Sequence, residues 1–149
     1  MTKINKSFTD KLCSLLSFLN YTRKEFELVT EEMDEDPVRM AIRGVAVEAN
    51  QYELELKTHL QNLSIPRNLF SNNIINCDEL LNNIRGIINA ESLNDILDIC
   101  AKSERFFETA YRNILNEYFP YPSLHEMLVY QLNGIKYTFM KIKLLSFYQ

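Results

Sequence analysis

Residues that break secondary structure are scarce in this sequence, which has only three glycines and four prolines among 149 residues. Because glycine and proline form most tight turns, a β fold with many short strands would need more of them. The hydrophobic fraction of 46% is ordinary for a globular protein, so the chain can bury a core. We therefore predict an all-α fold of long helices, with residues 1–149 forming a single domain.

Cysteine and histidine, the usual ligands of metal sites, are also scarce. Cys13, Cys77 and Cys100 are odd in number and widely spaced, a pattern that favours free thiols over a disulfide framework or a zinc site. The only histidines are His59 and His125, and neither stands three residues after a glutamate. The Glu-x-x-His spacing of di-iron helical bundles is therefore missing, and both histidines are interpreted as surface residues.

Long apolar runs and a strong charge of one sign are absent as well. No segment approaches the ~20 apolar residues of a membrane span, and the N-terminal "MTKINKSFTDKLCSLL" is too polar for a signal peptide. We therefore expect a cytoplasmic protein without a membrane partner. The net charge of −4 gives no reason to expect nucleic acid as a partner. Neither a phosphate loop nor a nucleophile elbow is present, so we expect no catalytic residue and favour a protein that is not an enzyme.

Four long amphipathic segments are present. Asp36 is a suitable N-cap with Pro37 at the first helical position, and Ser92 with Asp95 resembles a capping pair. The predicted helices cover residues 8–33, 37–63, 92–118 and 123–147.

The connections between these segments predict their topology. The first and last connections are only a few residues long, so each joins an antiparallel helix hairpin. The middle connection, residues 64–91, is unusually long for a compact domain and contains a short predicted helix near 78–88. It can span a helix of ~39 Å and return the chain to the end where the second helix begins. Two hairpins joined by one long crossover form a ferritin-like four-helix bundle.

The last predicted helix is apolar on more than one side. A helix of this kind is buried on more than one side, so either the crossover or a second subunit covers its outer face. We therefore expect a homo-oligomer, a dimer, formed through this helix or through the crossover. The apolar residues outside the inner stripe are Met127, Tyr130, Leu132, Tyr137, Met140, Leu144 and Phe147.

Three runs of sequence resemble a bacterial ferritin-like family of unknown function, some of whose members are found under stress conditions. They are "IRGI" in the crossover, "NDILDICAKSERFFETAYRNIL" in the third helix and "YQLNGIKYTFMKIKLL" in the fourth. The resemblance implies a ferritin-like fold and a stress-associated role. The residues that match the motifs of this family are Glu48, Gln51, Tyr52, Glu55, Leu56, Glu104, Ala110, Tyr111, Arg112 and Gln131.

The sequence departs from the pattern of this family at three positions. Ile84 and Ile87 stand where the family has histidine and tryptophan in the crossover, and Phe139 stands where a histidine is expected in the fourth helix. Each replacement removes a side chain that could bind a metal or donate a hydrogen bond.

Glu104 is the strongest candidate for an inward-facing carboxylate. It falls within an apolar stripe of the third helix, and a buried carboxylate is costly unless it is compensated. Counting from the hairpin turn places Glu104 level with Tyr137 and Gln131 level with Ala110. Glu104 and Gln131 are then ~9 Å apart along the axis, too far to share one metal, so we expect Glu104 to meet Tyr137 or another hydroxyl, or to be held neutral by burial. The stripe comprises Leu97, Cys100, Phe107, Tyr111 and Ile114.

Two functional hypotheses follow. The first is a non-enzymatic ferritin-like bundle without a cofactor, acting as a stress-associated or interaction protein that self-associates. The alternative is a metal-binding protein with a carboxylate-rich, histidine-poor site for di-iron or manganese. Its candidate ligands are Glu25, Glu48 and Glu104, and the supporting polar residues are Gln51, Gln131 and Tyr137.

Overall fold

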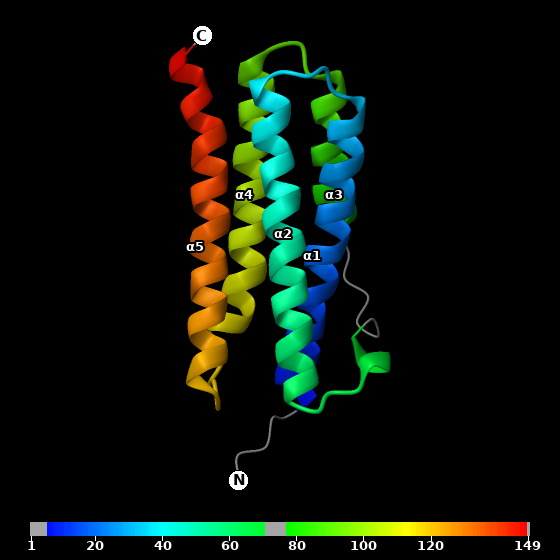
Figure 1. Ribbon diagram of the computed structural model, residues 1–149, viewed down its shortest axis with the longest axis vertical. Helices are drawn as coiled ribbons and strands as arrows, with labels where there is room; N and C mark the ends of the chain where they lie inside the picture. The colour runs from blue at the N-terminus through cyan, green and yellow to red at the C-terminus, as the bar shows by residue number, and fades with distance from the viewer. Residues whose placement is uncertain (1–5, 71–76, 149) are drawn as a thin grey trace.

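A computed structural model describes residues 6–70 and 77–148 of the protein (Figure 1), and its regular secondary structure in those ranges is entirely helical, without a strand. This confirms the predicted all-α class. Residues 71–76 of the expected crossover lie outside the described residues. The long helices are α1 (Lys6–Glu32), α2 (Pro37–Asn62), α4 (Leu93–Leu115) and α5 (Pro122–Leu144). The shorter helices are α3 (Asp78–Arg85) and the 3₁₀ turns η1 (Arg67–Leu69), η2 (Gly86–Asn89) and η3 (Leu145–Tyr148).

Local signals in the sequence set the starts of α2 and α4. The Asp36 side chain accepts a hydrogen bond from the Arg39 N–H at 2.8 Å, with Pro37 at the first helical position. The Ser92 hydroxyl accepts one from the Asp95 N–H at 3.2 Å. Each cap satisfies a backbone donor that the first turn of a helix would otherwise leave unpaired.

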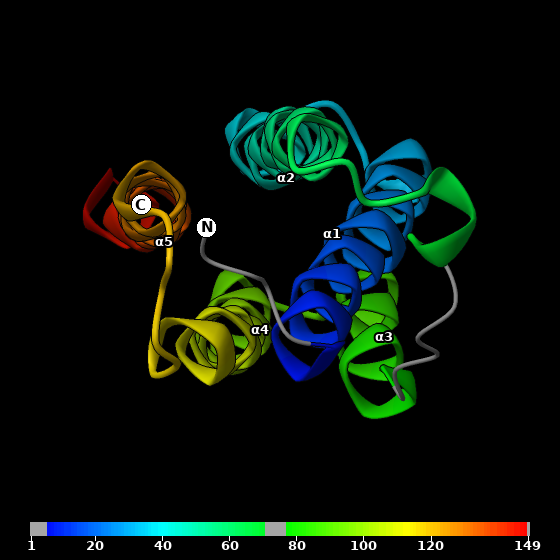
Figure 2. The same cartoon turned by 90° about the horizontal axis from the view of Figure 1, so that it is seen from below.

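The long helices lie alongside one another as two antiparallel hairpins, α1 with α2 and α4 with α5 (Figure 1). The chain leaves α2 at one end of the bundle and enters α4 at the other, so that α2 and α4 run in the same direction. Seen along the helices, α2 has α1 and α5 as neighbours, and α4 lies between α1 and α5 on the opposite side (Figure 2). The connection between the hairpins therefore crosses the height of the bundle.

Aromatic side chains from three helices meet in the core. The Phe107 ring of α4 lies 5.0 Å from that of Phe18 and 5.8 Å from that of Phe139, between ring centroids. The Phe139 ring also packs edge-on against Phe26 of α1 at 6.4 Å. Phe139, which stands where the resemblance expects a histidine, is thus a core residue at 3% exposure.

The short helix α3 packs against α1 and α4, on the side of the bundle away from α5 (Figures 1 and 2). Leu80 and Ile84 of α3 and Ile87 of η2 are buried. The Asn83 side chain donates hydrogen bonds to the Ile99 carbonyl at 3.0 Å and to the Ser103 hydroxyl at 3.1 Å. The described part of the crossover therefore does not cover the outer face of α5.

Candidate functional site

The polar side chain buried in the middle of α4 is Ser103, which corrects the expectation for Glu104. Ser103 is fully buried and donates to the Ile99 carbonyl at 2.9 Å, whereas Glu104 is half-buried. The predicted stripe residues Cys100, Phe107, Tyr111 and Ile114 are buried, and only in the turn between Cys100 and Phe107 does the buried position fall one residue before Glu104. Burial raises the pKa of Glu104, and the positive charge of Lys136 on α5 opposes this effect. No hydrogen bond joins Glu104 to Tyr137 among the described residues.

The other two candidate carboxylates have partners of their own. Glu25 of α1 is 4% exposed and forms an ion pair with Arg85, which fastens α3 to α1. Glu48 of α2 is half-buried and accepts a hydrogen bond from the Tyr52 hydroxyl. Within residues 6–70 and 77–148, the protein has no group of three or more His, Cys, Asp or Glu side chains placed to hold a metal ion. The structure therefore does not bring the three predicted ligands together.

Two of the predicted supporting residues, Gln51 and Tyr137, lie at the surface. Gln51 is exposed, and its side chain donates to Glu55 at 3.0 Å. Tyr137 is 57% exposed, and the Lys141 ammonium lies 5.1 Å from its ring centroid, within cation–π distance. Neither side chain points to a shared internal site.

The third supporting residue, Gln131, is the centre of a buried hydrogen-bond network. Its carbonyl oxygen accepts from the Tyr111 hydroxyl at 2.9 Å, in agreement with the predicted level of Gln131 beside Ala110. Its nitrogen donates to Glu55 at 3.0 Å. Burial, followed by the nearby Tyr52 and Glu55, raises the pKa of Tyr111, which therefore stays protonated. The network links α2, α4 and α5, and it uses both polar atoms of the Gln131 side chain.

The Tyr52 side chain of α2 packs tightly against α5 while its hydroxyl bonds to Glu48 on α2 itself. Its ring lies against the backbone of Gly134, where an added Cβ would come within 1.8 Å of the tyrosine oxygen. Burial raises the pKa of Tyr52, and the hydrogen bond to Glu48 raises it further. The helices can approach this closely only because residue 134 has no side chain.

Sequence reasoning missed Glu53, the most deeply buried acidic residue of α2. It is 2% exposed and accepts hydrogen bonds from Asn20 at 3.0 Å and Arg23 at 3.1 Å, with the Lys57 ammonium at 3.3 Å. Burial raises the pKa of Glu53, but these partners outweigh it and lower the pKa overall. The sequence pattern could have revealed Glu53, because it stands three residues before Leu56 and therefore on the apolar face of the predicted helix. The cluster joins α1 to α2.

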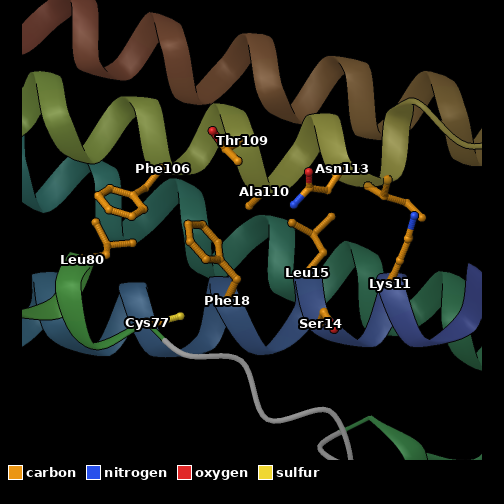
Figure 3. Close-up of a pocket in the computed structure, with 11 residues that line it drawn as sticks. Lys11, Ser14, Leu15, Phe18, Cys77, Leu80, Phe106, Thr109, Ala110 and Asn113 are labelled. Carbon is orange, nitrogen blue, oxygen red and sulfur yellow. The ribbon is translucent and has the colours of Figure 1, made fainter. Parts of the chain in front are cut away.

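An open trough of about 420 Å³ lies between α1 and α4, next to the start of α3 (Figure 3). The Leu80 end adjoins α3, and Lys11 of α1 stands at the other end. Polar side chains, including Thr109 and Asn113, come from α4. No pattern in the sequence predicts this trough, because it depends on the distance between two helices. Its apolar walls include Leu15, Phe18, Leu80, Phe106, Ala110 and Ile114.

None of the described helices is long and apolar enough to cross a membrane. Comparison of the chain with protein-family models, with curated proteins and with solved structures finds no match. The ferritin-like resemblance therefore rests on the motif residues of the sequence.

Proposed function

We propose that the protein is a non-catalytic, ferritin-like helical bundle that acts as an interaction protein by associating with a second copy of itself. The two hairpins and the long crossover between them support the ferritin-like part of the proposal. The buried polar side chains are held by one another, as around Gln131 and Glu53, or by backbone carbonyls, as at Thr138, which favours a structural role for them over a catalytic one.

The observation that carries the proposal is a double row of exposed apolar side chains on α2 and α5. Within each row the residues stand seven apart, so that they form a line along the helix as in the seam of a coiled coil. Met140 and Phe147 extend the surface, at 46% and 76% exposure. The rows are Met40 (74%), Val47 (60%) and Leu54 (51%) on α2, and Tyr130 (69%), Tyr137 (57%) and Leu144 (43%) on α5.

The two rows border the same line of contact between α2 and α5. Gly134 of α5 packs under Tyr52 of α2. Tyr130 stands four residues before Gly134 and Tyr137 three residues after it, so both lie on the same side of α5 as Gly134. On α2, Met40 and Val47 stand in the same relation to Gly44, which faces Thr138 of α5. Because all of these row residues are exposed, the rows lie on the outer side of the contact and form one surface, which we call the α2–α5 face.

A second copy of this chain is the partner that best fits the α2–α5 face. The α2–α5 face presents eight exposed apolar side chains, and a contiguous apolar patch of this kind marks an interaction surface on a soluble protein. Both rows have the same seven-residue period, so two identical faces can interdigitate about a two-fold axis. Polar Gln51 and Asn133, both exposed, lie beside the rows, and residues of this kind fix the register of helix pairing.

Sedimentation velocity and light scattering of the full chain test this proposal. We expect a mass twice the 17.6 kDa of the chain, and we expect Tyr137→Glu to give a monomer because it places a charge in the centre of the α2–α5 face. Leu28→Glu is the matched control, since Leu28 of α1 is also 57% exposed. That variant should remain a dimer. A wild-type monomer at 100 µM, or a dimeric Tyr137→Glu protein, would overturn the proposal.

A further inference from the structure

We infer that the trough between α1 and α4 is a binding site for a small uncharged amphiphile, a molecule with an apolar body and one hydrogen-bonding head. This inference is independent of self-association, because the trough lies between other helices than the α2–α5 face. Three properties of the trough carry it: size, wall chemistry and charge.

The size of the trough suits a small ligand. Its volume of about 420 Å³ lies within the range of ~300–1,000 Å³ of small-molecule sites. Its walls run from Phe18 to Lys11 on α1 and from Phe106 to Asn113 on α4 (Figure 3). Seven residues of helix correspond to ~10 Å, so the trough accommodates a short extended chain rather than a compact disc.

The apolar walls are held in place by the core behind them. Leu15 and Ile114 are buried at 2% and 1% exposure. The Phe18 ring packs edge-on against Phe107, with 5.0 Å between centroids and 83° between planes. Leu80 is anchored on α3, which the Asn83 hydrogen bonds fix to α4. The trough is therefore formed before a ligand enters, and binding does not require ordering of its walls.

The charges around the trough favour an uncharged ligand. Lys11 is the one charged side chain among the described lining residues, and it already forms an ion pair with Glu117. An anionic ligand would have to share Lys11 with Glu117, whose negative charge repels it, and a cationic ligand would be repelled by Lys11 itself. Each of these costs binding free energy that a neutral head avoids.

Asn113 supplies the partner for the neutral head. Its side chain points toward the trough near Leu15 (Figure 3), and its carboxamide makes no hydrogen bond to the other described residues. A carboxamide offers both a donor and an acceptor, so it can bind an alcohol or an amide without a change of charge. An alcohol of about eight carbons matches the length of the trough and this single polar contact.

Titration of the ¹⁵N-labelled full chain with 1-octanol, followed by NMR, tests this inference, with octanoate and octylammonium as the charged probes. We expect 1-octanol to shift the amide signals of Leu15, Phe18 and Ala110 in a saturable manner. We expect the two charged probes to bind about tenfold more weakly, because each must bury a charge without a free partner. Absence of saturable shifts at these residues, or tighter binding of either charged probe, would refute the inference.

Two variants locate the site. Ala110→Phe fills the trough and should weaken 1-octanol binding at least about tenfold. Ala101→Phe, the same change at an exposed position of α4, should leave it unaltered. Asn113→Leu keeps the size of the side chain but removes the polar contact to the head, and should weaken 1-octanol binding about fivefold, the equivalent of one hydrogen bond. Unchanged octanol affinity in a folded Ala110→Phe protein, or in a folded Asn113→Leu protein, would show that octanol binds elsewhere.

Discussion

Replacing Gly134 by alanine should destabilise the protein, although the same change usually stabilises a helix. Glycine inside a helix costs ~1 kcal/mol relative to alanine, so a gain is expected where space allows. At Gly134 the added Cβ would lie 1.8 Å from the Tyr52 oxygen and 3.0 Å from its Cζ. The ring is 3% exposed and its hydroxyl is bound to Glu48, so it cannot turn away without losing that bond. Overpacking of this kind costs ~1–3 kcal/mol.

Because 1.8 Å is far inside contact distance, we take the upper half of this range, ~2–3 kcal/mol, and after the ~1 kcal/mol helix gain the net loss in the free energy of unfolding is roughly 1–2 kcal/mol. For a chain of this size each kcal/mol lowers Tm by ~2–4 °C, so we expect Gly134→Ala to melt about 2–8 °C below the wild type. Thermal and urea denaturation followed by circular dichroism measure both quantities. Gly44→Ala is the matched control on the same helix contact, because its added Cβ would lie 3.7 Å from the Thr138 methyl group, an ordinary contact distance. That variant should melt ~2–4 °C higher than the wild type.

A double-mutant cycle identifies Tyr52 as the cause. Tyr52→Phe removes the oxygen that the new Cβ would meet, so Gly134→Ala should cost about 1 kcal/mol less in that background than in the wild type. The remaining approach to Cζ, at 3.0 Å, keeps part of the cost. If Gly134→Ala proves as stabilising as Gly44→Ala, or if its cost is the same with and without the Tyr52 hydroxyl, the close packing of α2 on α5 has been misjudged.

Three further substitutions test the polar interior. Burial raises the pKa of Glu104 above its ordinary value, so the folded state favours the protonated form and loses stability as pH rises through that pKa. Glu104→Gln removes this cost and should melt at or above the wild type at pH 7. A large drop in Tm would contradict us. The pKa of Glu53 is lowered, so the stability contributed by its carboxylate is present at pH 7 and is lost as pH falls through that pKa. Glu53→Gln weakens the contact to Arg23 and should lower the free energy of unfolding by ~1–3 kcal/mol in urea denaturation at pH 7, and by less at pH 4. An equal cost at the two pH values would argue against the ion pair. Tyr111→Phe leaves the buried Gln131 oxygen without its donor and should cost ~1–3 kcal/mol, while a neutral effect would mean that water replaces the hydroxyl.

The sequence predicted best the features that short-range signals determine. The caps at Asp36 and Ser92 and the spacing of apolar residues gave helix starts close to those of α2 and α4. Counting from the hairpin turn also placed Gln131 at the level of Ala110, and its partner proved to be Tyr111. These predictions succeed because each depends on residues that are neighbours along one helix or across one short connection.

Positions at the edge of a stripe were harder to predict. The spacing of apolar residues on α4 predicted Glu104 as the inward-facing polar residue, while the buried one is Ser103. The Ser103 hydroxyl also accepts a hydrogen bond from Asn83 of α3. Which of two adjacent residues faces inward depends on the rotation of the helix about its axis. Here the hydrogen bonds of Asn83 on α3 help to set the rotation of α4, and no pattern within the α4 sequence encodes them. The Glu53 cluster and the trough depend in the same way on the distance between helices, which the complete packing sets.

The three departures from the family pattern support the proposal of an interaction protein. Ile84 and Ile87 are buried where α3 and η2 pack on the bundle, and Phe139 packs between Phe26 and Phe107. Positions at which the resemblance expects a possible metal ligand or a hydrogen-bond donor thus contribute apolar packing in this chain. The interior polar groups that remain, centred on Gln131, already hydrogen-bond to one another. The apolar surfaces that no described residue covers lie on the outside of the bundle, on the α2–α5 face and along the trough. Such surfaces support a function in binding rather than in catalysis.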